Sequence, residues 1–180
     1  MRIPVFVSGP TKLNKAQDQS RDRIMRELSR LQLEPRALGR SDYPSDFPLR
    51  EVYVIAKHCS GGIILGFRQF SATAGVWKKG TKEQRRLARG KPEHFPTPWN
   101  HLEAGILFGL QLPLLIFREE PLRGGVFDEG VTDVFIHNMP PGDIEGANLE
   151  GFREVLLKWS SRVREHYYRI STGPGGLTGR

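Results

Sequence analysis

Short apolar runs alternate with amphipathic stretches along the chain, and this alternation predicts an α/β domain. Apolar runs of the buried-strand type occupy residues 61–67 and 112–117, a first strand at 3–10 runs into a Gly-Pro turn, and a last strand is expected at 133–138. A further strand is expected over 33–39, where Pro35 favours a position at the edge of the sheet. Strands that alternate with helices pair in parallel. We therefore expect a three-layer sandwich around a mostly parallel sheet of about five strands.

The amphipathic stretches between these runs predict four helices, at 15–32, 49–59, 97–111 and 149–168. The last helix has one clear apolar face, formed by Phe152, Leu156, Trp159 and Val163. That face is expected to dock on the sheet, and a second apolar set (Val155, Leu157) leaves a homo-oligomer contact as an alternative. Residues 1–170 are expected to form a single domain. Loops are expected at 40–48 and 118–131, a turn region at 140–148, and a disordered tail at 171–180.

The segment TPWNHLEAGILFGLQLPLLIF (97–117) predicts a helix that leads into a buried strand, with Thr97 as N-cap and Pro98 as first residue. At about 100° per residue, five apolar side chains share an arc about 140° wide: Trp99, Leu102, Ile106, Leu107 and Leu110. Glu103 lies inside this arc, whereas Asn100, His101 and Ala104 lie outside it. A carboxylate on a buried face must be paired, have a shifted pKa or meet a ligand. The alternative is a carboxylate at the edge of the face that reaches solvent.

The composition is that of a globular protein. Of 180 residues, 38% are hydrophobic and 9% aromatic, which is enough for a good core. The single cysteine, Cys59, excludes an internal disulfide and is expected to be a buried, inert thiol. No apolar run approaches the 18 or so residues of a membrane helix, and the first residues enter a strand without a signal-peptide layout. We expect a cytoplasmic protein without a membrane partner, and the spacing of the five histidines predicts no metal site.

A basic insertion at 68–97 holds most of the net charge of +7. This segment has eight lysines and arginines against two glutamates, which gives it a charge of +6. A solvated mobile loop and a surface for an acidic small molecule or protein are both compatible with this pattern. Nucleic acid is the least favoured partner, because no aromatic-rich binding strip accompanies the charge.

Three segments are expected to meet beyond the carboxyl ends of the strands, where parallel sheets bind their ligands. They are Ser8-Gly9-Pro10, Gly66-Phe67-Arg68 and the helix that carries Trp99, Asn100 and Glu103. The glycine turn can offer backbone N–H groups to a phosphate or ribose. Aromatic rings can stack on a base, and the arginine can pair with phosphate. These residues are candidates for a nucleotide pocket, and each also has a plain structural interpretation.

The order of these motifs resembles that of a TIR domain. The opening strand VFVSG, the strand GGIILGF and the WNHLE sequence (99–103) carry the resemblance, because W-x-x-x-E is the spacing of the catalytic glutamate in NAD-cleaving TIR proteins. The same layout is similar to the nucleoside 2-deoxyribosyltransferase family, through VFVSGP and the E-x-G sequence at Glu103. Both families have a flavodoxin-like sheet and a glutamate that acts on an N-glycosidic bond.

The resemblance implies an enzyme in which Glu103 stabilises or attacks an oxocarbenium-like ribosyl centre. For a TIR-like enzyme the substrate is NAD, no further cofactor is needed, and the products are nicotinamide and either ADP-ribose or a cyclic ADP-ribose. A stand-alone domain of this type suits bacterial antiviral defence, with the product read by a separate effector. Self-association as a homo-oligomer is also a feature of this class.

Two alternatives stay open. The Ser8-Gly9-Pro10 turn is closer to the deoxyribosyltransferases than to the Ser-Tyr or Ser-His pair of TIR domains, which favours a nucleoside or nucleotide N-glycosidase or transferase. The stretch PEHFPTPW lacks the aspartate that these transferases carry before the catalytic helix. The second alternative is a non-catalytic module that binds a nucleotide or a protein, for which Glu103 would be dispensable.

Overall fold

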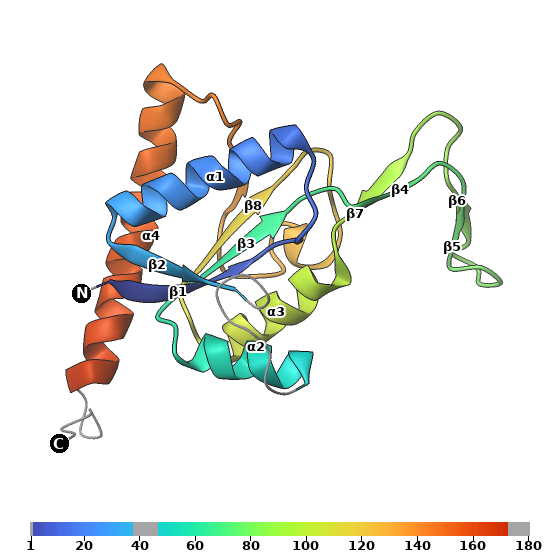
Figure 1. Ribbon diagram of the computed structural model, residues 1–180. Helices are drawn as coiled ribbons and strands as arrows, with labels where there is room; N and C mark the ends of the chain where they lie inside the picture. Colours follow the sequence, from blue (N-terminus) through green and yellow to red (C-terminus); the bar gives the residue numbers. More distant parts are fainter. Residues whose placement is uncertain (1, 38–46, 173–180) are drawn as a thin grey trace.

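Five parallel strands form the central sheet of the computed structural model, which describes residues 2–37 and 47–172 (Figure 1). The strands are β1 (Ile3–Ser8), β2 (Leu33–Arg36), β3 (Gly62–Gly66), β8 (Leu114–Arg118) and β9 (Ile136–Asn138). Their order is β2-β1-β3-β8-β9, and all four pairings are parallel. This is the doubly wound, flavodoxin-like order. It confirms the predicted α/β sheet and the edge position of the strand that contains Pro35.

Helices cover both faces of the sheet, as expected for a three-layer sandwich (Figure 1). On one face, α1 (Lys15–Arg30) and α4 (Gly146–Thr172) pack on a core that includes Val5, Leu65 and Phe117. On the other face, α2 (Pro48–Lys57), α3 (Pro98–Gly109) and the 3₁₀ turn η1 (Gly125–Phe127) enclose a second core. The predicted buried face of the last helix is confirmed. It consists of Phe152, Leu156, Trp159 and Val163.

Local signals account for where two of the helices begin. Asn14 and Gln17 form a reciprocal capping box at the start of α1. Thr97 caps α3 by accepting a hydrogen bond from the Trp99 N–H at 3.3 Å, and Pro98 is the first helical residue, as predicted. Both helices therefore begin directly after connections that follow β1 and the basic insertion.

Several boundaries differ from the predicted ones. α4 begins at Gly146 and continues to Thr172, so the expected tail at 171–180 is helical at its first two residues and otherwise lies outside the described part of the chain. The predicted loop at 40–48 also falls almost wholly outside it. β9 covers only Ile136–Asn138, since the residues before it turn away from the sheet. The expected loop at 118–131 begins within β8 and includes η1.

The predicted buried face of α3 is wrong at most positions: of the five apolar residues in the predicted arc, Leu107 alone is buried. The buried residues of α3 are Asn100, Ala104 and Leu107, whereas Trp99 and Leu102 are 41% and 50% exposed. The packed side is thus rotated by roughly one residue from the apolar arc. Small and polar side chains face the sheet because α3 lies close over β1 and β3, where Asn100 reaches into the interior and bonds Ser8.

The basic insertion is an ordered antiparallel arm, not the loop that the charge pattern suggested. Two strand pairs form it: β4 (Phe70–Ala72) with β7 (Glu93–Phe95), and β5 (Val76–Trp77) with β6 (Arg85–Arg86). The arm projects away from the three-layer body (Figure 1). Its outer part is held by side-chain pairs, among them Arg85 to Glu93 at 2.8 Å and Lys78 to Glu83. Most of its basic residues are exposed.

Two expectations from the composition can be compared with the structure. Cys59 is buried just after the C-cap of α2, as predicted. Within residues 2–37 and 47–172, no helix is both long enough and apolar enough to cross a membrane.

Candidate functional site

A cavity of about 380 Å³ opens beyond the carboxyl ends of β1, β2 and β3. β1 lies between β2 and β3, so the connections from β1 and β3 leave on opposite faces and create a crevice there. Gly9 and Pro10 follow β1, Leu65 and Phe67 belong to β3 and its continuation, and Glu103 comes from α3. The structure thus brings together residues from all three segments that the sequence pointed to.

Glu103 is the carboxyl group that lines this cavity, and its pKa is shifted. Burial raises its pKa from 4.5 to about 7, and a hydrogen bond from the Ser8 side chain opposes this only in part. The neighbouring walls are apolar and include Val7, Leu65 and Phe67. A carboxyl group in such surroundings loses hydration when it ionises, so its protonated form is favoured. At pH 7 the side chain is therefore divided between the two forms and is poised for chemistry with protons or cations.

Ser8 and Asn100 form a buried relay behind Glu103. The Asn100 Nδ2 donates to the Ser8 Oγ at 2.8 Å, and the Ser8 hydroxyl in turn bonds the Glu103 carboxyl. Ser8 is 1% exposed and Asn100 is fully buried, so neither side chain has water as a competing partner. The relay directs the single Ser8 proton towards Glu103. It holds the carboxyl by a neutral donor rather than by a cation.

Arg21 is a cavity residue that the sequence reasoning missed. It lies on α1, where its guanidinium bonds Asp18 at 2.9 Å and Asp22 at 2.8 Å. Gln17, Arg21, Ile24 and Leu28 follow one another at helical spacing on one side of the helix. The apolar half of this stripe, Ile24 and Leu28, is buried in the core. The stripe continues in polar form towards the helix N-terminus, which faces the carboxyl edge of the sheet, and this continuation was the available signal.

Gly66 and Trp99 lie outside this cavity. Gly66 lies against the Phe127 ring on the opposite face of the sheet, and it leaves no room there for a Cβ. Trp99 is on the exposed side of α3 and does not line the cavity with Glu103. The expected stacking of Trp99 on a bound ring therefore has no support in this arrangement.

Arg68 is already paired and also lies outside the cavity. Its guanidinium donates to Glu119 at 2.8 Å, and its backbone N–H donates to the same carboxylate at 2.9 Å. Burial raises the pKa of Glu119, but the hydrogen bonds from Arg68 and from Gln17 outweigh it and keep the pKa below its usual value. Arg68 thus fixes the base of the arm to the residue after β8, and it is not available to a phosphate in this cavity.

No protein-family model matches the chain, and no curated protein matches it. In the described part of the chain, His, Cys, Asp and Glu side chains form no group of three or more that could hold a metal ion. The chemistry of the site must be inferred from Glu103, its relay and the cavity they face.

Proposed function

We propose that the protein cleaves the N-glycosidic bond of a nicotinamide nucleotide, with NAD as the leading substrate and Glu103 as the catalytic residue. One observation carries this proposal: a largely desolvated carboxyl, held by a neutral hydrogen-bond relay, lines a cavity at the switch point of a parallel sheet. Such a position is where open α/β sheets bind ligands. The cavity volume is within the range of small-molecule sites.

The chemistry follows from charge. When the bond between nicotinamide and ribose breaks, nicotinamide leaves as a neutral molecule and positive charge develops on the ribosyl carbon. A carboxylate next to that carbon stabilises the charge or attacks it, and water or another atom of the substrate then completes the reaction. Glu103 is partly ionised near pH 7, and a developing cation favours its ionised form. No general acid is required for this leaving group.

The other lining residues fit the parts of such a substrate. Leu65, Phe67 and Met25 offer apolar surface to a ring, and Arg21 places positive charge at the wall of the cavity. Gly9, which follows β1, belongs to the cavity wall and has no side chain to cover its backbone, so a ligand can approach the main chain there. Hydrolysis would give ADP-ribose, and attack by an atom of the substrate itself would give a cyclic product.

A nucleoside or nucleotide N-glycosidase, or a 2-deoxyribosyltransferase, is the second candidate. A cavity of about 380 Å³ suits a nucleoside-sized ligand, so a dinucleotide would extend beyond it. The Ser8-Gly9-Pro10 turn, with Gly9 and Pro10 in the cavity wall, also favours this alternative. A base other than nicotinamide leaves more easily once protonated, and the protonated fraction of Glu103 can supply that proton.

Product analysis by mass spectrometry tests both candidates. The protein is incubated at pH 8, where Glu103 is mostly ionised, and at pH 6 with NAD, with nucleosides and with nucleoside monophosphates. Glu103→Gln is expected to lower the cleavage rate by at least about a hundredfold, the lower end of what a positioned catalytic group contributes. Glu150→Gln, a change at an exposed position of α4, is the control and should keep full activity.

Each result has a definite meaning. Nicotinamide released by the unmodified protein and not by Glu103→Gln would support the leading proposal, and the partner product would separate hydrolysis from cyclisation. Free base from a nucleoside or monophosphate would support the second candidate. Turnover that survives Glu103→Gln would contradict both. Absence of turnover, together with unchanged ligand binding by Glu103→Gln, would favour a non-catalytic binding module.

A further inference from the structure

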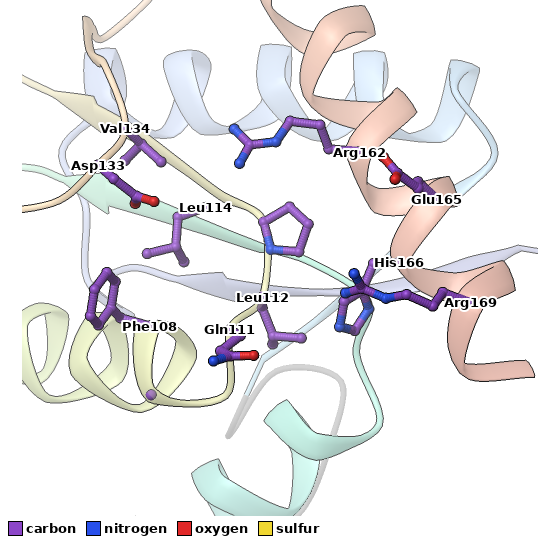
Figure 2. A pocket seen from close by; sticks show the side chains of 12 residues that line it. Phe108, Gln111, Leu112, Leu114, Asp133, Val134, Arg162, Glu165, His166 and Arg169 are labelled. Carbon is purple, nitrogen blue, oxygen red and sulfur yellow. The ribbon is translucent and has the colours of Figure 1, made fainter. Parts of the chain in front are cut away.

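A second cavity, of about 600 Å³, lies at the opposite, amino-terminal edge of the sheet (Figure 2). It is bounded by the end of α3, the residues that lead into β8, the segment before β9 and the C-terminal half of α4. Phe108, Leu112 and Leu114 provide its apolar wall. Nothing in the proposed chemistry of Glu103 uses this cavity, which is separated from that residue by the length of the strands.

Three basic side chains of α4 line this second cavity. Arg162, His166 and Arg169 are spaced four and three residues apart, so they lie on one side of the helix. Within the part of the chain that the structure describes, neither arginine side chain makes a hydrogen bond or an ion pair. Arginines on the same helix do have such partners elsewhere, as in Arg153 with Glu27 at 3.1 Å and Arg164 with Ser160 at 3.0 Å. The two guanidinium groups are therefore available to a ligand.

His166 is the buried member of this basic group. It is only 7% exposed, and its Nδ1 has no hydrogen-bond partner among the described residues. Burial, with a smaller contribution from the positive charge of Arg169, lowers the pKa of His166 and so favours its neutral imidazole. A buried ring nitrogen without a hydrogen-bond partner is energetically unfavourable. A ligand that enters the cavity and bonds this nitrogen would remove that penalty.

Two carboxylates and an amide complete the polar lining. Asp133 lies in the segment before β9 and Glu165 in α4 (Figure 2). Gln111 has a left-handed backbone conformation and directly follows the C-cap of α3. The carboxylates form no salt bridge with Arg162 or Arg169 within the described chain. Because they are acceptors only, they would repel a bare anion but accept hydrogen bonds from hydroxyl groups. The lining is thus suited to a molecule that has both an anionic end and hydroxyl groups.

We propose that this cavity binds a phosphorylated ribose, either free or as part of a nucleoside monophosphate. The phosphate lies at His166 and Arg169, which are neighbours. The exposed Arg162 side chain, which extends towards Asp133 in Figure 2, reorients to bond the third terminal oxygen of the phosphate monoester. A carboxylate ligand, with two oxygens, would leave one of these groups without a partner. The ribose hydroxyls donate to Asp133 and Glu165, and a base, if present, rests on Phe108 and Leu112.

Isothermal titration calorimetry with three probes tests this proposal: ribose 5-phosphate, adenosine 5′-monophosphate and adenosine. Both phosphorylated probes are expected to bind, and adenosine at least about tenfold more weakly, since it lacks the charge-assisted bonds. Binding of the monophosphate alone would identify a nucleotide as the ligand and would still support a phosphorylated ribose. If neither phosphorylated probe binds, the proposal is wrong.

Variants separate this cavity from the one at Glu103. The double change Arg162→Gln/Arg169→Gln alters two exposed side chains, so the fold should persist, and it should weaken binding at least about tenfold. Lys158→Gln removes a charge from the same helix at an exposed position outside the cavity and should leave binding unchanged. Glu103→Gln should also have no effect on this binding. If the phosphorylated probes bind equally well to the double variant, or lose affinity only in Glu103→Gln, they occupy the other cavity and the proposal is overturned.

The proposal does not rest on the proposed function. Ribose 5-phosphate has no N-glycosidic bond and is therefore not a substrate for either candidate reaction at Glu103, so its binding tests this cavity independently and failure of one proposal leaves the other intact.

Discussion

Among the described residues, Glu103 combines a raised pKa with the absence of a cationic partner. Its only side-chain hydrogen bond in the relay comes from Ser8, whose hydroxyl is in turn oriented by Asn100. A lysine or arginine in the same place would lower the pKa and neutralise the charge that a developing ribosyl cation needs. A neutral donor orients the carboxyl and leaves its charge available to the substrate.

The titration of Glu103 predicts a stability difference that depends on pH. Its pKa is about 4.5 unfolded and about 7 folded, so between these values the unfolded chain releases a proton that the folded protein retains. Stability therefore falls as pH rises from about 4.5 to 7 and stays lower above that range. At about 1.4 kcal/mol per pKa unit, the loss is at most about 3.5 kcal/mol. Glu103→Gln lacks this titration and should be more stable than the unmodified protein at pH 8, by about 1–3 kcal/mol, but not at pH 4.5.

Urea unfolding of both proteins at pH 4.5 and pH 8 measures this difference directly. Every other titrating group is common to the two proteins, so its contribution cancels when the two free energies of unfolding are subtracted. An equal stability difference at both pH values would show that Glu103 ionises as freely in the folded protein as in the unfolded chain.

Individual site residues were predictable to different degrees. Glu103, Gly9 and Phe67 could be placed at the site because they follow buried strands or stand out as a charge among apolar residues. Arg21 and Met25 were missed: the polar end of the α1 stripe is a weak signal for Arg21, and it gains meaning only when the position of α1 relative to β1 and β2 is known. Trp99 was misplaced because its apolar character suggested burial, whereas its side of α3 is turned to the surface.

At the scale of elements, the strands of the central sheet were predicted well. The position and N-cap of α3 were also predicted, but its buried face was not. β3 and β8 are buried on both faces, so every residue from Gly62 to Gly66 and from Leu114 to Arg118 is buried, and a continuous apolar run is a strong signal. α3 has apolar residues on its exposed side and Asn100 on its buried side, so periodicity pointed the wrong way. The short strands of the arm have no apolar alternation at all, and only their pairing defines them.

Alanine substitutions at two glycines, Gly66 and Gly105, are expected to change stability in opposite directions, because the packing around the two positions differs. A Cβ at Gly66 would collide with the ring of the fully buried Phe127, whereas a Cβ at Gly105, on the outer side of α3, would meet no atom within 4 Å. Gly66→Ala should destabilise the protein by about 1–3 kcal/mol through overpacking. Gly105→Ala should stabilise it by about 0.5–1 kcal/mol, because alanine loses less backbone entropy in a helix.

Thermal unfolding, followed by circular dichroism, compares the two alanine variants. Since both changes add one methyl group, the difference between them isolates the environment of each site. A Gly105→Ala variant that is clearly destabilised would indicate that this side of α3 is covered in solution, for example by a second copy of the chain.

At the scale of the whole molecule, the basic arm is an appendage to a complete domain. Among the described residues, neither hydrophobic core includes a residue of 70–95. Phe70 and Phe95 are register partners at the base of the arm, so its two ends lie side by side. The arm holds most of the net charge, and the three-layer body is close to neutral.

Replacement of residues 71–94 by a two-residue Gly-Ser link should therefore leave the body folded. Circular dichroism is expected to retain the helical signal, and the melting temperature should stay within a few degrees, the range that corresponds to about 1 kcal/mol. Retention on a heparin column should fall, because the exposed lysines and arginines of the arm are lost. A variant that is unfolded would show that the arm contributes to the core.

The position of the arm has a consequence for how easily the chain closes its sheet. The arm lies within the crossover from β3 to β8, whose register partners Gly62 and Leu114 are about 50 residues apart, and without the arm that connection would be roughly half as long. Loop-closure entropy grows only with the logarithm of length, so the longer connection opposes pairing by about 0.6 kcal/mol more. The antiparallel strands of the arm are close in sequence and can pair before the crossover closes, which shortens the flexible length still further. A parallel sheet can thus carry a large charged projection at this one connection with almost no thermodynamic effect on its own assembly.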